Sequence, residues 1–205
     1  MTQVSPLHAG DGLLDPDGHR RAIEIITRRR LMLPDDEYRR TLLGVVVNCV
    51  DVLVLTDEMK ALMGWRVNEP FPGHPHPSGG RQRNGESYEQ TAARHLKRDL
   101  GIELSENRFK FVNSASFPWS TSAQGGPCHM NGVLMLAEIT HEELAARKVQ
   151  EKGDFNASEL FDLADVTIAH GFHPAIALGA AIVRRNLAQF GRVETIDPQV
   201  LANLK

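Results

Sequence analysis

The chain has 205 residues, of which 41% are hydrophobic and 24% charged, as expected of a medium-sized globular protein that buries a core of its own. A formal net charge of −3 gives no electrostatic reason to expect nucleic acid or an anionic membrane as a partner. The two distant cysteines predict neither a disulfide framework nor a zinc site, and no segment resembles a membrane span or a signal peptide, so we expect a cytoplasmic location.

The first part of the chain predicts an arm, two helices and a strand. The first residues are rich in Gly, Pro and Asp and predict a loose arm, followed by a short helix at 19–31. We therefore take 1–31 as an N-terminal extension and 32–205 as one domain. Within this domain, Pro34 and the three acidic residues after it predict the start of a helix. The β-branched segment 45–55 then predicts a buried strand.

The rest of the chain predicts further strands and helices. Segment 68–80 holds four prolines and three glycines, and this composition predicts an irregular loop. A helix follows at 86–100 and ends at Gly101, a residue type favoured just after a helix. Other segments with the pattern of regular elements are a hairpin strand at 59–67, strands at 109–114 and 132–139, and a closing helix at 172–190. Strands interleaved with helices indicate an α/β sandwich.

The most specific motif lies in segment 79–102, which reads GGRQRNGESYEQTAARHLKRDLGI. Residues that fall at fixed spacings in it are Gly80, Glu86, Arg94, Leu96, Gly101 and Ile102. The segment thereby resembles the box of the Nudix hydrolase superfamily, G-x5-E-x7-R-E-U-x-E-E-x-G-U, in which U is a bulky apolar residue. Asp99 stands at the position of the last metal-binding carboxylate, whereas His95 and Arg98 replace two other glutamates. The resemblance implies a Nudix fold with a degenerate box.

The helix in this motif carries the residues expected to do chemistry. His95, Arg98 and Asp99 share one face, because residues three and four apart are neighbours on a helix. In Nudix enzymes this face is all carboxylate and collects Mg²⁺ ions. One carboxylate beside a cation supports a single hard, oxygen-preferring ion, Mg²⁺ or Mn²⁺. We expect Glu86 and Arg94 to form a structural ion pair. The residues expected to face the core are Tyr88, Ala92, Leu96 and Leu100.

A second resemblance concerns the segment before and into the box, GWRVNEPFPGHPHPSGGR. It is similar to the corresponding region of the GDP-mannose mannosyl hydrolases, an atypical Nudix branch that lacks box glutamates at the same two positions. The resemblance implies a Nudix-fold α/β/α sandwich with a mixed sheet, a homodimer, and a small-molecule nucleoside diphosphate sugar as substrate. Enzymes of this branch attack the anomeric carbon of the sugar and expel the nucleoside diphosphate with one Mg²⁺.

Individual site residues follow from this resemblance, position by position. The residues implied for substrate binding are Asp51, Arg66 and Arg81, and Arg98 joins them because its charge favours anions. The residues implied as metal ligands are Gly79, through its carbonyl, Asp99 and Asp154. Arg66 and Arg81 would also act in catalysis, by stabilising the charge on the departing diphosphate.

The general base is left open by the resemblance. Phe155 aligns with the branch's basic histidine, and a phenyl ring cannot take a proton. Histidines titrate near neutral pH, and His76 in the proline-rich loop lies beside the predicted site, so we take it as a catalytic candidate. The other candidates are His74, His129, His170 and His173. Trp119 could stack on a nucleobase or pack in the core.

The predicted function is hydrolysis of a GDP-mannose-like nucleotide sugar into sugar and nucleoside diphosphate. Because no base is identified, one alternative is a module that binds a nucleotide or nucleotide sugar without hydrolysis. Another is a conventional Nudix diphosphatase that attacks phosphorus, and the loss of helix carboxylates argues against it.

Overall fold

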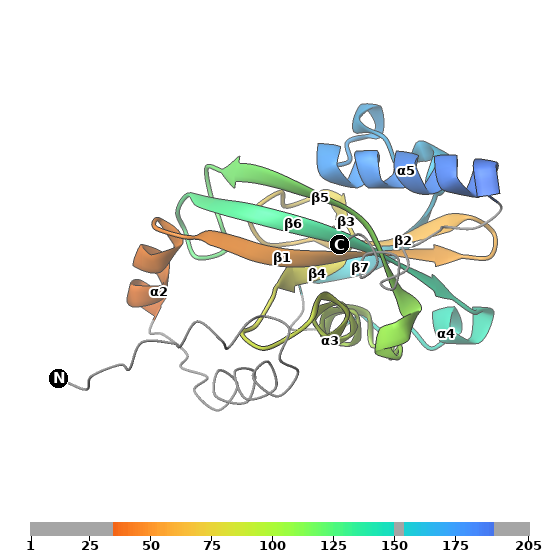
Figure 1. The fold of residues 1–205 in the computed structure, drawn as a ribbon, viewed down its shortest axis with the longest axis horizontal. Coiled ribbons are helices and arrows are strands. Elements are labelled where there is room, and N and C mark those ends of the chain that lie inside the picture. The colour runs from red at the N-terminus through yellow and green to blue at the C-terminus, as the bar shows by residue number, and fades with distance from the viewer. Residues whose placement is uncertain (1–34, 150–153, 191–205) are drawn as a thin grey trace, which may run out of the picture.

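In the part of the chain that the structure describes, a mixed sheet of seven strands forms the middle layer, with α3 (Tyr88–Leu100) on one face and α5 (Pro174–Phe190) on the other (Figure 1). The computed structural model describes residues 35–149 and 154–190. The expected α/β/α sandwich with a mixed sheet is confirmed. The predicted arm and short helix within 1–31 lie outside the described residues.

Strand β1 (Val46–Thr56) is the centre of the sheet, because it pairs with three other strands. It runs parallel to β6 (Cys128–Ile139) and antiparallel to β2 (Lys60–Arg66) and β4 (Ser78–Arg81). The outer strands are β5 (Phe109–Trp119), which pairs with β6, and β3 (Pro75–His76) and β7 (Phe155–Asp162), which pair with β2. The other elements are α2 (Asp35–Leu42), α4 (His141–Ala145) and the 3-10 helices η1 (Glu106–Arg108), η2 (Leu163–Asp165) and η3 (Ile168–His170).

The side chains of β1 alternate between two cores, as the two-residue period of a strand requires. Residues 50, 52 and 54 belong to the core beneath α3, which includes Ala92, Leu96 and Leu100 of that helix. Leu53 and Leu55 belong to the opposite core, which includes residues 176, 180 and 183 of α5. A central strand with both faces covered reads as a continuous apolar run, and this explains the pattern of segment 45–55.

Local signals in the sequence define α3. Ser87 caps its N-terminus through a reciprocal pair of hydrogen bonds with Gln90, and Gly101 ends it in the left-handed conformation at φ 68°. The predicted C-terminus is therefore confirmed, whereas Glu86 lies in the preceding loop and not in the helix. The prediction that Tyr88 faces the core is wrong, since this first residue of the helix is 38% exposed at the end of the packed face.

The predicted irregular loop at 68–80 contains two short strands, β3 and β4. The prediction failed because glycine was taken as a loop signal, whereas Gly79 permits a close approach between strands. A Cβ at this position would lie 2.0 Å from Oδ1 of Asp51 on β1. Strand β7 and helix α4 were not predicted, and β5 and β6 are longer than expected.

Cys49 and Cys128 are both buried free thiols. Burial raises the pKa of Cys49 to about 12, so this thiol stays protonated at neutral pH. No helix in the described part of the chain has the length and apolar character that a membrane span requires.

Candidate functional site

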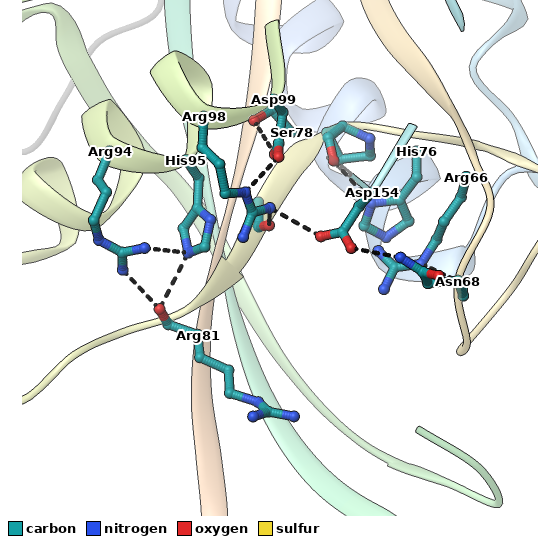
Figure 2. Close-up of polar contacts among 12 residues, drawn as sticks. Arg66, Asn68, His76, Ser78, Arg81, Arg94, His95, Arg98, Asp99 and Asp154 are labelled. Carbon is teal, nitrogen blue, oxygen red and sulfur yellow. Dashed lines mark hydrogen bonds and ion pairs between the residues drawn. The ribbon is translucent and has the colours of Figure 1, made fainter. Parts of the chain in front are cut away.

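Polar side chains from several elements meet beside β4 (Figure 2). Arg98 comes from the last turn of α3, Arg66 ends β2 and His76 ends β3. Asp154 immediately precedes β7, and Asn68 lies two residues beyond β2. Residues distant in sequence meet here because β4 pairs with β1 and β7 pairs with β2.

Arg98 is the centre of this group, because its guanidinium bonds all three predicted metal ligands. Nε donates to Oδ1 of Asp99 at 2.6 Å. Nη2 donates to the carbonyl of Gly79 at 3.0 Å and to Oδ2 of Asp154 at 2.9 Å. The structure thus brings Gly79, Asp99 and Asp154 together around the guanidinium. Figure 2 shows Arg98 with its bonds to Asp99 and Asp154.

The second oxygen of each carboxylate is also occupied. Ser78 donates to Oδ2 of the fully buried Asp99 at 2.7 Å, and Asn68 donates to Oδ1 of Asp154 at 3.0 Å. Within residues 35–149 and 154–190, no group of three or more His, Cys, Asp or Glu is placed to hold a metal ion. With Arg98 in this position the oxygens do not fit a dication, because a positively charged guanidinium is already bonded to all three groups.

Asp51 lies on β1 opposite Gly79, with its carboxyl packed over that glycine. Burial raises the pKa of Asp51 to about 7, although the charge of Arg66 lowers it, and the charge of Asp99 raises it further. No described residue donates a hydrogen bond to the Asp51 side chain. A carboxyl group that titrates near neutral pH and has free oxygens is suited to take a proton.

Arg66 lies close enough to Asp51 for its charge to lower the pKa of that carboxyl group, and it acts on His76 as well. The loop after β2 holds Arg66, whose Nε donates to the carbonyl of Asn68 at 3.0 Å and whose Nη2 donates to that of Glu69 at 3.2 Å. Nδ1 of the half-buried His76 lies 2.9 Å from the carbonyl of Pro77. Burial and the charge of Arg66 lower the pKa of His76 to about 4, so the ring is neutral at pH 7. A neutral ring that donates through Nδ1 keeps Nε2 as an acceptor.

The predicted ion pair of Glu86 and Arg94 is confirmed. Arg94 donates to both carboxylate oxygens, from Nε at 2.8 Å and from Nη2 at 2.7 Å, and Nη2 also donates to the carbonyl of Arg81 at 2.9 Å. Burial raises the pKa of Glu86, but hydrogen bonds from Arg94, the backbone of Arg83 and Thr91 outweigh it and hold the pKa at about 2. The pair ties the loop before α3 to the helix and to β4, which is a structural role.

The two residues that replace box glutamates differ in charge. His95 is buried against Gly80, where a Cβ would lie 2.6 Å from its Cε1. Its Nε2 lies 3.1 Å from the carbonyl of Arg81, and burial together with the charge of Arg98 lowers its pKa to about 3. His95 is therefore a neutral packing residue, whereas Arg98 adds a positive charge.

Arg81 is the predicted site residue whose side chain the structure does not bring to this group. It points away from Arg98 (Figure 2), donates to Gln124, and lies with its guanidinium 4.5 Å from the centre of the Tyr38 ring. There it lines a pocket of about 420 Å³ together with residues 45–48. Only its carbonyl, which accepts from Arg94, takes part in the box.

Aromatic rings form a cluster next to His76, and sequence reasoning named three of the five rings but did not predict that they meet. The rings are Phe71, His74, Phe117, Trp119 and His173. Centroids of Trp119 and His173 lie 4.9 Å apart, and burial lowers the pKa of His173. These rings come from distant segments, so no spacing in the sequence indicates the cluster. Ser78 and Asn68 were also missed.

Comparison with known proteins gives a family match and structural neighbours. The family model described as NUDIX domain matches residues 47–178, from β1 into α5. No curated protein matches the sequence. Among solved structures, the chain is similar to a MutT NUDIX hydrolase from Burkholderia pseudomallei, with 21% identity and a TM-score of 0.55 over 68% of this chain and 98% of that one.

Two other solved structures are named with their ligands. The NUDIX domain of Shewanella oneidensis NrtR, complexed with ADP ribose, has 21% identity and a TM-score of 0.55 over 76% of this chain and 99% of that one. A bifunctional NMN adenylyltransferase/ADP ribose pyrophosphatase from Francisella tularensis, complexed with AMP and Mn ion, has 17% identity and a TM-score of 0.50 over 76% of this chain. The chain spans only 46% of that protein, and 57% of a matched MutT/nudix family protein from Enterococcus faecalis. These similarities establish the fold.

Proposed function

This chain belongs to the NUDIX domain family, and we propose that it hydrolyses a nucleoside diphosphate sugar at the anomeric carbon. In this reaction, water attacks the anomeric carbon and gives up a proton to a base. The bond between this carbon and the phosphate oxygen breaks, and the nucleoside diphosphate leaves with the electron pair. The products are the free sugar and an intact nucleoside diphosphate.

The observation that carries the proposal is the carboxyl group of Asp51, half-buried beside the charge of Arg66. With a pKa raised to about 7 by burial, Asp51 is partly ionised at neutral pH and accepts a proton readily when one is released. Its oxygens accept no hydrogen bond from a described residue, which leaves them open to water. Asp51 therefore takes the role of general base that Phe155 cannot fill.

The arginines support the leaving-group half of the reaction. Negative charge grows on the diphosphate as it departs, and guanidinium groups stabilise phosphate oxygens through charged hydrogen bonds. Arg98 leaves 41% of its side chain exposed, so a ligand can reach it. The aromatic cluster around Trp119 and His173 supports binding of the nucleobase, because rings of this kind stack on a base.

His76 is the rival base. Its free Nε2 is a suitable acceptor, but a pKa of about 4 makes it a weaker base than Asp51 at neutral pH. Substitution separates the two residues. We expect Asp51→Asn to lower kcat about a hundredfold or more, as loss of a general base does, and His76→Asn to lower it much less.

Hydrolysis in H₂¹⁸O tests the proposal directly, with GDP-mannose as a substrate whose diphosphate is bonded to the anomeric carbon. Attack at the anomeric carbon places the label in the sugar and releases a nucleoside diphosphate. Attack at phosphorus, as in a conventional diphosphatase, places the label in a phosphate and releases a nucleoside monophosphate. Label found in phosphate would overturn the proposed reaction.

Binding without hydrolysis is the second candidate function, and Phe155 favours it. This residue is 4% exposed in the core beneath α3, so no proton acceptor stands where the related branch has its histidine. The non-hydrolytic function predicts saturable binding of a nucleotide sugar by calorimetry, with unchanged ligand recovered after prolonged incubation. Turnover that Asp51→Asn abolishes would exclude it.

A further inference from the structure

Arg98 occupies the position at which the family's box places a carboxylate for metal binding. We infer that its guanidinium takes the place of a bound divalent cation, so that the site holds a diphosphate without metal. The inference rests on the proposed function only for the identity of the ligand, because occupation of the site by Arg98 is testable with metal ions alone.

The contacts of Arg98 are those that a metal ion would otherwise make. The same three groups, Asp99, the Gly79 carbonyl and Asp154, each accept one of its N–H groups at 2.6 to 3.0 Å. Ser78 and Asn68 satisfy the remaining carboxylate oxygens at 2.7 and 3.0 Å. The buried carboxylate of Asp99 is thereby neutralised and fully hydrogen-bonded without an ion.

Charge leads to the same conclusion. Asp99 and Asp154 together carry two negative charges, and Arg98 cancels one of them. A single remaining negative charge attracts a dication weakly, and Mg²⁺ in addition requires near-octahedral oxygen ligands. His95, at the other altered box position, is neutral and buried, so it adds no ligand charge on this face. A metal ion and Arg98 therefore compete for the same oxygens.

Arg98 also keeps donors for a ligand. A guanidinium has five N–H groups, of which Nε uses one and Nη2 uses two in the contacts above. Nη1 donates to no described residue, and the side chain is 41% exposed. Its two N–H groups are free to bind phosphate oxygens, while the carboxylates of the buried Asp99 and the partly exposed Asp154 fix the orientation of the guanidinium. An arginine stays charged at all physiological pH values. The positive charge that binds phosphate is therefore part of the protein and needs no metal ion.

Mn²⁺ titration of the ligand-free protein, followed by electron paramagnetic resonance, tests the inference. We expect no saturable site in the wild type at submillimolar Mn²⁺. Arg98→Glu restores a box carboxylate beside Asp99 and Asp154, and should bind one Mn²⁺ at least tenfold more tightly. Lys97→Glu is the matched control, because it makes the same charge change on an adjacent residue that pairs with Glu103 at the surface. It should behave as the wild type.

Pyrophosphate binding in the presence of EDTA gives the second readout, by calorimetry. The wild type should bind pyrophosphate saturably in EDTA, where no divalent cation is available. Arg98→Gln, which preserves size and polarity should Arg98→Glu fail to fold, should lose at least tenfold in affinity in EDTA. A wild-type Mn²⁺ site that disappears in Asp99→Asn would overturn the inference and would favour the predicted metal site on Gly79, Asp99 and Asp154. Failure of nucleotide sugars to turn over would affect the proposed function alone.

Discussion

Among the residues of the candidate site, Asp51 is one whose burial costs stability in a pH-dependent way. Its pKa of about 7 in the folded protein lies far above the ordinary value of 3.8, because burial disfavours the charged form. Between about pH 4 and 7 the folded state therefore holds a proton that the unfolded state has released. The free energy of unfolding falls as pH rises through this window.

We predict that Asp51→Asn stabilises the protein above pH 7, where it removes a buried charge. The expected gain at pH 8 is about 1–4 kcal/mol, on the scale of 1.36 kcal/mol per pKa unit, and it should nearly vanish at pH 4. Thermal unfolding of wild type and variant at both pH values measures it. A gain that is equal at both pH values would show that burial does not perturb this carboxyl group.

Gly79 is a second residue of the site for which we predict an effect on stability. A Cβ at this position would lie 2.0 Å from Oδ1 of Asp51 and 2.7 Å from the carbonyl oxygen of Val50. We predict that Gly79→Ala costs about 1–3 kcal/mol of unfolding free energy through overpacking, and also weakens pyrophosphate binding because the Gly79 carbonyl orients Arg98. Gly126→Ala is the matched control, since nothing lies within 4 Å of the added methyl group. Equal effects in urea unfolding would contradict the prediction.

At the scale of elements, α3 depends on the ion pair that joins it to the preceding loop. The side chains of Glu86 and Arg94 are only 10% and 23% exposed. We predict that Arg94→Ala costs about 1–3 kcal/mol at pH 7, because it removes the charged donor shared by Glu86 and the Arg81 carbonyl. Lys97→Ala, which removes a pair whose side chains are 62% and 70% exposed, should cost less than about 0.5 kcal/mol.

The pH dependence of unfolding tests the prediction for Arg94→Ala. Glu86 has a folded pKa of about 2, below its ordinary value of 4.5, so its contribution is present above pH 4.5 and is lost as pH falls toward 2. The difference between wild type and Arg94→Ala should therefore shrink between pH 5 and pH 2.5 in urea unfolding. A difference that stays constant over this range would mean that Arg94 acts through packing alone.

Elements with local signals were predictable from sequence, and those that depend on distant partners were not. Helix α3 carries its own cap at Ser87 and its own stop at Gly101, and β1 has a continuous apolar pattern. Strand β4 lacks such a signal, because two glycines in sequence predict a loop. Gly79 and Gly80 form a strand here because β1 packs closely against them. Caps and apolar patterns in the sequence thus predict most helices and strands, whereas short strands such as β4 depend on pairing with a distant segment.

The same distinction applies to the site. The spacing of the box identified Glu86, Arg94 and Asp99, which lie on or next to one helix. The contact of Arg98 with Asp154 spans 56 residues, and only the pairing of β7 with β2 creates it. Sequence reasoning therefore gave Gly79, Asp99 and Asp154 as ligands of a weakly bound metal ion beside Arg98. It could not foresee that the arginine beside them would occupy all three.

At the scale of the whole molecule, we predict a symmetric homodimer. The start of β1 and the turn before it expose Leu43, Val45 and Val46 to 68%, 48% and 52%, an apolar strip suited to an interface. Leu43→Glu should shift the mass toward a monomer in light scattering at micromolar concentration. Leu178→Glu on α5, where the leucine is 53% exposed, is the matched control and should leave the mass unchanged. A monomeric wild type would remove the prediction.

The parallel pairing of β1 with β6 also sets the order in which the chain can fold. The side chains of Asn48 and Asn131 meet across this pair although 83 residues separate them. The hairpin of β1 and β2 and the capped helix α3 form from neighbouring residues. Pairing of β1 with β6 requires the long intervening chain to be ordered, and this has a large entropic cost. Folding on the millisecond-to-second scale is expected for such a topology. Until β6 pairs with it, one edge of the apolar strand β1 stays unpaired. We therefore expect newly synthesised chains at high concentration to pair with one another through this edge.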